Sequence, residues 1–267
     1  MKKILFPTDF SLNSLHAIRY GIRLFEGQDV KFYLFNSYVD PSVGASMTYV
    51  FEEQMKSISM TMMRKVYEEL QDEFGHEGLQ LELINRYGDL PYALNPVLED
   101  EGIDLVIMGS SGASGANISI FGSNAYATMK DAPCPVLTVP LQAPLKAPER
   151  IGLASEEEMG GDEAILEPLY DLARVHDSWV MGIHVSKKNR VTDGAPSDSA
   201  SGTDSLPYID LKVDDPLQGI ELAIGRYQID MLSIILPKRS LMERIFHKSV
   251  SKQIAKQIAI PILALHA

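Results

Sequence analysis

The stretch IDLVIMGSSGASGANISIFGSN, residues 103–124, decides the fold because a buried strand and a glycine-rich turn meet in it. Leu105–Met108 is an unbroken apolar run, which is typical of a parallel strand covered on both faces. Gly109, Gly112 and Gly122 follow, and no residue between them is charged. Small residues after a buried strand either let the chain turn or let another group approach the backbone closely.

Strands and helices alternate through the first half of the chain. The pattern predicts strands over residues 2–9, 31–38, 79–87, 104–109 and 135–140, and helices over 11–27, 52–74, 89–102 and 122–129. Ser11 is the expected N-cap of the first helix. The second helix is amphipathic, and the residues expected on its apolar, buried face are Met55, Ile58, Met62, Val66 and Leu70. This alternation predicts an α/β fold with right-handed crossovers and a parallel sheet.

The second half of the chain repeats this pattern at fixed offsets. Ile103-Asp104 recurs as Ile229-Asp230, 126 positions later, whereas Ile4 aligns with Ile151, 147 positions later. The difference of 21 residues is missing from the second copy. A duplicated α/β domain is therefore predicted, with a degenerate second copy.

The predicted domain boundaries follow from this repeat. We expect a first domain over residues 1–140, a short Pro-rich linker over 141–149 and the second domain over 150–267. About residues 187–205 are rich in Ser, Gly, Asp and Pro, with hardly an apolar side chain. Such a segment cannot bury enough surface to order itself, so a flexible loop is predicted there.

Composition excludes several classes of partner. A net charge of -12 argues against binding to nucleic acid or to an anionic membrane. No run approaches the ~18 apolar residues of a membrane helix, and Pro7 and Asp9 interrupt the apolar N-terminus, so a soluble cytoplasmic protein is expected. Cys134 is the one cysteine and is expected to be a small buried side chain. The six histidines are scattered without ligand spacing, so no metal site is predicted.

The glycine-rich turn is a candidate phosphate site. Ligands of open parallel sheets bind beyond the carboxyl ends of the strands, and a helix that begins there offers free N–H groups to an anion. Glycines remove the Cβ atoms that would hold phosphate oxygens away, and Ser123 could cap the next helix or donate to a phosphate. The spacing is neither the Walker pattern nor the dinucleotide fingerprint. A simple flexible turn is the alternative.

Taken together, four motifs resemble the universal stress protein family. They are KILFPTDFS near the start, DLVIMGSSG, the nine-residue gap to GSNA, and DAPCPVLTVP. The resemblance covers the first half of the chain, and the second half is similar in layout with weaker motifs. It implies a tandem protein of two open, twisted, five-stranded and mostly parallel sheets. Each would have the Rossmann-like strand order 3-2-1-4-5 of the adenine nucleotide alpha hydrolase group.

In this family the ATP-binding signature is a glycine, two residues, a second glycine, nine residues and then Gly-Ser. Gly109, Gly112, Gly122 and Ser123 have this spacing. The resemblance implies that the nucleoside is bordered by Pro7, Thr8 and Asp9. Ser37 would lie near the adenine, and Met108 and Gly109 would line the ribose side. The residues implied to hold the phosphates are Gly112, Gly122, Ser123 and Asn124. The implied ligand is ATP, or AMP or ADP, with Mg²⁺ only as part of the bound nucleotide.

Some residues depart from the family pattern or have a second interpretation. Ser111 stands where many members have His, and Asn124 and Ala125 replace the more usual Val and Ser, Thr or Glu. Asp9 would accept a hydrogen bond from the base or ribose. Alternatively, Asp9 caps the first helix, although Ser11 is available for that role.

The second copy lacks the three glycines. At the offset of 126, Gly109 becomes Ile235, Gly112 becomes Lys238 and Gly122 becomes Lys248. Side chains would fill the space of the phosphates, so one nucleotide per chain is predicted, in the first domain only. The basic segment 237–248 is either a different anion site or a solvated face at a helix start.

The last strand of each copy is short, apolar and expected at a sheet edge, where exposed strands invite pairing. These strands are VLTVP, residues 136–140, and ILALH, residues 262–266. The family forms dimers through this edge, so the resemblance implies that the two domains pair within one chain. A homodimer of the whole chain stays open.

The predicted function is that of an ATP- or AMP-binding stress-response protein whose nucleotide state alters its interactions. No catalytic residue is predicted, because no base besides Asp9 and no second carboxylate stands near the phosphates. Two alternatives stay open. One is an interaction or dimerisation module without a nucleotide, and the other is an enzyme that hydrolyses ATP slowly or transfers a nucleotidyl group.

Overall fold

The computed structural model describes residues 1–39, 48–75, 78–111, 122–155, 163–186, 207–212, 216–236 and 259–266. The chain forms two compact units, and it passes from the first to the second between Leu145 and Lys146, within the predicted linker. Among the helices of the described ranges, none is both long and apolar enough to cross a bilayer.

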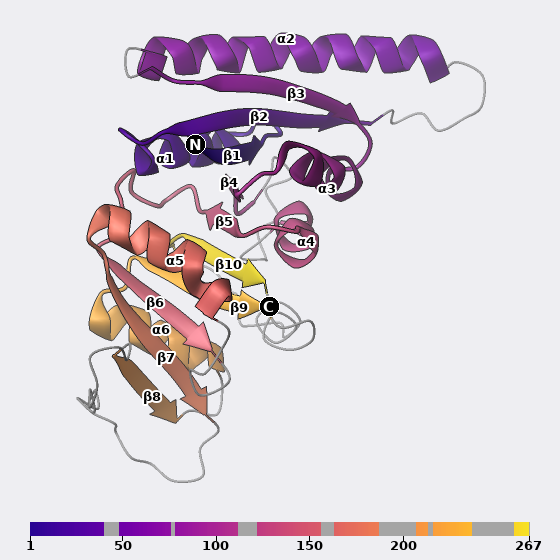
Figure 1. The fold of residues 1–267 in the computed structure, drawn as a ribbon. Helices are drawn as coiled ribbons and strands as arrows, with labels where there is room; N and C mark the ends of the chain where they lie inside the picture. Colours follow the sequence, from indigo (N-terminus) through magenta and orange to yellow (C-terminus); the bar gives the residue numbers. More distant parts are fainter. Residues whose placement is uncertain are drawn as a thin grey trace. The chain divides into compact units, whose positions relative to one another are not determined.

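The first unit has the predicted alternation of strands and helices. Its elements are β1 (Lys2–Pro7), α1 (Leu12–Leu24), β2 (Val30–Tyr38), α2 (Thr48–Phe74), β3 (Leu81–Tyr87), α3 (Leu90–Glu101), β4 (Leu105–Gly109), α4 (Ser123–Asp131) and β5 (Val136–Val139). The strands lie in the order β3-β2-β1-β4-β5 and every pair is parallel (Figure 1). The predicted parallel α/β sheet is therefore confirmed for this unit.

The order of the strands reverses at β1, which lies between β2 and β4. Residues Lys2 to Pro7 pair in register with Val30 to Phe35 on one side, while Ile4 pairs with Leu105 on the other. At such a reversal the crossovers leave the sheet in opposite directions, which opens a crevice at the carboxyl ends of the central strands.

Helix α1 packs very closely against the sheet through Gly21. A Cβ atom built on Gly21 would collide with the ring of Phe6 on β1 and would lie 2.9 Å from Cδ1 of Ile107 on β4. Ser11 begins the helix as predicted, because its side chain accepts a hydrogen bond from the Ser14 N–H group. The cap and the glycine together fix where the N-terminus of α1 meets the sheet.

The buried face of α2 differs from the predicted stripe in its N-terminal half. Ile58 and Met62 are 53% and 42% exposed, whereas Ser59 and Met63 are buried. The predicted buried positions are wrong by one residue in this half of the helix. The polar side chain of Ser59 points inward instead, where it is hydrogen-bonded to Asn36. Val66 and Leu70 are buried as predicted.

The second unit has the same strand order. Its elements are β6 (Arg150–Ser155), α5 (Glu163–His176), β7 (Trp179–Ser186), β8 (Tyr208–Lys212), α6 (Pro216–Tyr227), β9 (Met231–Leu236) and β10 (Ile262–His266). They form the parallel series β8-β7-β6-β9-β10. Counted within the unit, this is again the order 3-2-1-4-5. The predicted loop at about 187–205 lies outside the described residues, and so does all of the basic segment 237–248.

Both units hold their first strand with an aspartate at the start of the fourth. The Asp104 carboxylate accepts the N–H group of Lys3 at 2.7 Å, and the Asp230 carboxylate accepts that of Arg150 at 2.9 Å. The strand registers agree as well, because Ile4 pairs with Leu105, and Ile151 with Met231, at the two offsets of the sequence repeat. The repeated Ile-Asp pair thus has a structural cause.

Replacing Gly21 with Ala is expected to lower the free energy of unfolding by about 1–3 kcal/mol. Alanine favours a helix over glycine, but overpacking against Phe6 and Ile107 outweighs that gain. The matched control is Gly225→Ala in α6, where no atom lies within 4 Å of the added Cβ. That variant is expected to gain roughly 0.5–1 kcal/mol. Urea unfolding measures both, and a Gly21→Ala chain as stable as the parent would contradict the packing.

Candidate functional site

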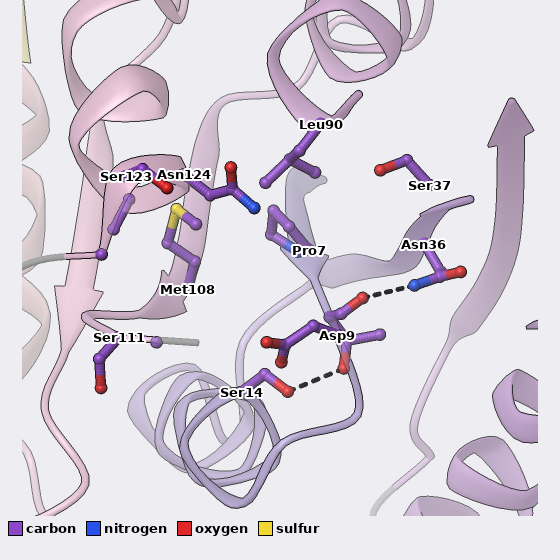
Figure 2. Close-up of a pocket in the computed structure, with 14 residues that line it drawn as sticks. Pro7, Asp9, Ser14, Asn36, Ser37, Leu90, Met108, Ser111, Ser123 and Asn124 are labelled. Carbon is purple, nitrogen blue, oxygen red and sulfur yellow. Dashed lines mark hydrogen bonds between the residues drawn. The ribbon is translucent and has the colours of Figure 1, made fainter. Parts of the chain in front are cut away.

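A pocket of about 230 Å³ lies at the carboxyl ends of β1, β2 and β4 (Figure 2). The lining residues are Pro7, Thr8, Asp9, Ser14, Asn36, Ser37, Leu90, Met108, Gly109, Ser111, Gly122, Ser123, Asn124 and Ala125. Nine of the ten predicted site residues are among them. The tenth, Gly112, lies outside the described residues.

The end of β1 is held in a tight turn by short side chains. Thr8 Oγ1 accepts the N–H group of Phe10 at 3.0 Å and lies 3.0 Å from the Ser14 hydroxyl. Phe10 adopts a positive φ of 63°, so these bonds stabilise a backbone conformation that side chains rarely adopt. Asp9 Oδ1 accepts the N–H group of Ser11 at 3.1 Å. Ser11, not Asp9, is the N-cap of α1, and Asp9 is an exposed residue that lines the pocket.

Gly109 allows α1 to approach the end of β4. A Cβ atom at this position would lie 2.9 Å from Nδ2 and 3.1 Å from the carbonyl carbon of Asn13. The Asn13 side chain donates from Nδ2 to the carbonyl oxygen of Ser111 at 2.9 Å. The first glycine of the motif is therefore required by helix packing, in addition to any role toward a ligand.

The first turn of α4 presents backbone donors to the pocket. Its N-cap is Gly122, whose missing side chain cannot cap the helix. The Gly122 N–H group donates to Ser110, and the first helical bond runs from the Tyr126 N–H group to the Gly122 carbonyl. The N–H groups of the residues between, Ser123 to Ala125, precede this ladder, and these residues line the pocket. Such a helix start suits an anion.

At the opposite end of the pocket, β2 continues past the end of β1. The carbonyl of Phe35 accepts the Thr8 N–H group at 2.9 Å, and that of Tyr38 accepts the Gly88 N–H group at 2.9 Å on the β3 side. Alternate residues of a strand bond to alternate neighbours. The backbone N–H and C=O groups of Ser37 therefore point to the same side as those of Phe35, toward β1. Because β1 ends at Pro7, opposite Phe35, no strand residue lies beside Ser37, and its backbone groups border the pocket.

A buried chain of polar side chains beneath the pocket was not predicted. Asn36 donates from Nδ2 to the carbonyl oxygen of Thr8 at 2.7 Å, and the Ser59 hydroxyl donates to Oδ1 of Asn36. Asn85 Nδ2 in turn donates to the Ser59 oxygen at 2.7 Å. The chain ties β1, β2, β3 and α2 together. The two asparagines near the carboxyl ends of β2 and β3 were the signal in the sequence, but Ser59, to which both are hydrogen-bonded, lies far from both of them along the chain.

Cys134 is buried, as predicted. Burial, together with the negative charge of Asp104, raises the pKa of its thiol to about 12, so the group stays protonated at neutral pH. Within the described part of the chain, no group of three or more His, Cys, Asp or Glu residues could hold a metal ion.

Solved structures share this fold. A universal stress protein from Archaeoglobus fulgidus superimposes with a TM-score of 0.70 at 15% identity, over 98% of this chain and 95% of that one. One from Pseudomonas aeruginosa, described as a putative universal stress protein, gives 0.60 at 13% identity over 100% and 93%. A family protein from Arabidopsis thaliana, solved with AMP bound, gives only 0.37 at 18% identity over 52% and 92%.

No curated protein matches the sequence significantly. The family model described as the universal stress protein family matches residues 1–140, the part of the chain that forms the pocket and its surrounding sheet. Since that match spans more than half of the 267 residues, the chain belongs to the universal stress protein family.

Proposed function

We propose that the pocket of the first unit binds an adenine nucleotide and that the chain acts in the stress response through nucleotide-dependent interactions. The observation that carries the proposal is the arrangement of backbone groups at the two ends of one pocket. The start of α4 offers N–H groups to a phosphate, and the edge of β2 at Ser37 offers donor and acceptor groups to a base.

The residues between these two ends suit a nucleoside. Figure 2 shows Ser111 and Ser123 on one side, Ser37 and Asn36 on the other, and the Asp9 carboxylate between them in this view. The carboxylate can accept a ribose hydroxyl, while Met108 and Leu90 give the pocket apolar surface. The fold also places the pocket at the strand reversal, where ligands of open α/β sheets bind.

We further propose that the nucleotide binds to the first unit only. At the position of Gly109 the second unit has Ile235 on β9, a branched side chain in place of a hydrogen. The replacements of the other two glycines, Lys238 and Lys248, lie outside the described residues but are far larger than glycine in any conformation.

The side chains of the pocket favour binding over catalysis. They are mainly hydroxyls, amides and apolar groups, with Asp9 as the carboxylate. General acid–base chemistry on a phosphate needs a group with a suitable pKa close to the transferred oxygen. The end of the pocket nearest α4 is instead lined by Ser111, Ser123 and Asn124, which can donate hydrogen bonds but do not titrate near neutral pH.

Replacing Gly122 with Val is expected to abolish nucleotide binding in calorimetric titrations with AMP and with ATP. The φ of -68° and ψ of 159° at Gly122 are extended values that valine adopts readily, so the fold should persist. The added methyl groups would crowd the N–H groups of the first turn. The parent chain is expected to bind about one nucleotide, and the variant none.

The Gly225→Ala chain, changed in α6 of the second unit, serves as the matched control and should bind as the parent does. Parent-like affinity in Gly122→Val would contradict the backbone site. A stoichiometry of about two, or one full-affinity site that survives in Gly122→Val, would contradict binding to the first unit alone.

Incubation of the purified chain with ATP and Mg²⁺ is expected to leave ATP intact over hours, because the proposed function needs no hydrolysis. Chromatographic analysis of the nucleotides is the measurement, with Gly122→Val as the blank for a contaminating ATPase. Release of ADP or pyrophosphate by the parent but not by this variant would favour an enzyme.

A further inference from the structure

We propose that two copies of the chain associate through the outer edge of β3, which pairs with β3 of the second copy in the antiparallel sense about a two-fold axis at Ile84. Among the described strands, β3 is the last one on its side of the first unit's sheet. The edge predicted to pair within the chain is that of β5, at the opposite end of the strand order. The inference goes beyond the proposed function and needs no bound nucleotide.

One side of β3 carries backbone groups that no described strand faces. On the other side, the Gln80 carbonyl accepts the Phe32 N–H group at 2.8 Å, and the Gly88 N–H group donates to the Tyr38 carbonyl at 2.9 Å. Successive residues of a strand bond to opposite sides, so the even-numbered residues of β3 face β2. The residues that direct their N–H and C=O groups outward are the odd-numbered ones, Leu81, Leu83, Asn85 and Tyr87. Such a row is a template for another strand.

Helix α2, drawn next to β3 in Figure 1, packs over a face of the sheet and leaves the edge open. The Ser59 hydroxyl donates to Oδ1 of Asn36 on β2 and accepts from Nδ2 of Asn85 on β3, so the helix covers both strands from one side. The outward carbonyl of Asn85 accepts Nη1 of Arg86 at 3.1 Å. A side chain of the same strand thus caps a carbonyl to which an N–H group of a second strand can donate instead.

The charges along β3 are complementary when the strand pairs with itself. Antiparallel pairing about Ile84 places Glu82 of each copy opposite Arg86 of the other, because these residues lie two positions before and two positions after the axis. Both residues are exposed. Opposite charges at facing positions stabilise a strand pair, whereas like charges destabilise it. This complementarity favours a second copy of the chain as the partner.

The same register satisfies the outward backbone groups. It places Leu83 opposite Asn85 and Leu81 opposite Tyr87, so that these residues can exchange N–H···O bonds in pairs. The charged residues then occupy the positions between, where facing side chains lie closest together. The Leu81 contact also covers part of the Tyr87 side chain, which is 50% exposed. A shift by one residue would set outward groups against inward ones, and a shift by two would separate the opposite charges.

The alternative is that the charges on this edge keep the chain monomeric, as in many sheet proteins. The two interpretations differ in what a reversed charge does. If the edge is solitary, reversal changes nothing. If the edge pairs with itself, each reversal sets like charges against each other twice, because the two-fold axis repeats every contact.

The test is sedimentation equilibrium of the full chain, without nucleotide, over a series of concentrations. An ionic strength of about 0.15 M limits the repulsion between two chains of net charge -12. A weak monomer–dimer equilibrium is expected, because a contact between strand edges is smaller than a standard interface. Glu82→Lys and Arg86→Glu, each alone, are expected to weaken dimerisation by about tenfold or more.

An equimolar mixture of these two variants is expected to form mixed dimers with the affinity of the parent, because every facing pair is then oppositely charged. The matched control is Glu167→Lys on α5, since Glu167 is likewise exposed and paired, with Arg174 at 2.6 Å. It should dimerise as the parent does. A parent that stays monomeric, parent-like affinity in both reversal variants, or a mixture that does not recover would each overturn the proposal.

Amide hydrogen exchange of the parent distinguishes this edge from any other dimer surface. In concentrated samples the N–H groups of Leu83 and Asn85 are expected to exchange more slowly than in dilute ones. The N–H group of Ile84, which faces β2 in both states, should show no such change. A dimer that forms without this alternation would overturn the proposal, while nucleotide binding, which calorimetry measures separately, would be unaffected.

Discussion

The pocket exists because β1 ends before its neighbour. Pro7 pairs with Phe35, whereas β2 continues to Tyr38, so the sheet has a gap at the carboxyl end of its central strand. Hydrogen bonds at Thr8 enforce this early end from two sides: its hydroxyl holds the turn at Phe10 and its carbonyl accepts the Asn36 amide. If β1 continued in register, its backbone would occupy the space that we assign to the base.

The sequence predicts the strands and helices of the first unit because local patterns determine them, and the family resemblance implies the ten site residues, nine of which line the pocket. Alternation of apolar strands with capped helices indicates the parallel sheet, and the spacing of Gly109 and Gly122 indicates the turn beyond β4. The role of Ser59 could not be predicted, since its partners Asn36 and Asn85 come from two strands. For the same reason the sequence pattern places Ile58 on the buried face of α2, whereas the structure has Ser59 there.

The two units show what the fold alone provides and what the side chains add. Both have the same strand order, and both tie the first strand to the fourth through an aspartate, Asp104 or Asp230. These features stabilise the sheet and need no ligand. The features that we connect with nucleotide binding, such as the small residues at and after the end of β4, occur in the sequence of the first unit. At the position of Gly109, the second unit has Ile235 instead.

The most direct test of this account is backbone amide hydrogen exchange, followed by NMR with and without saturating AMP. We predict that the N–H groups of Ser123, Asn124 and Ala125 exchange more slowly in the complex, as does that of Ser37, because both ends of the ligand contact the backbone. The control amides are those of α6, which should be unaffected. Unchanged exchange at the start of α4, with AMP shown to be bound, would contradict the phosphate site.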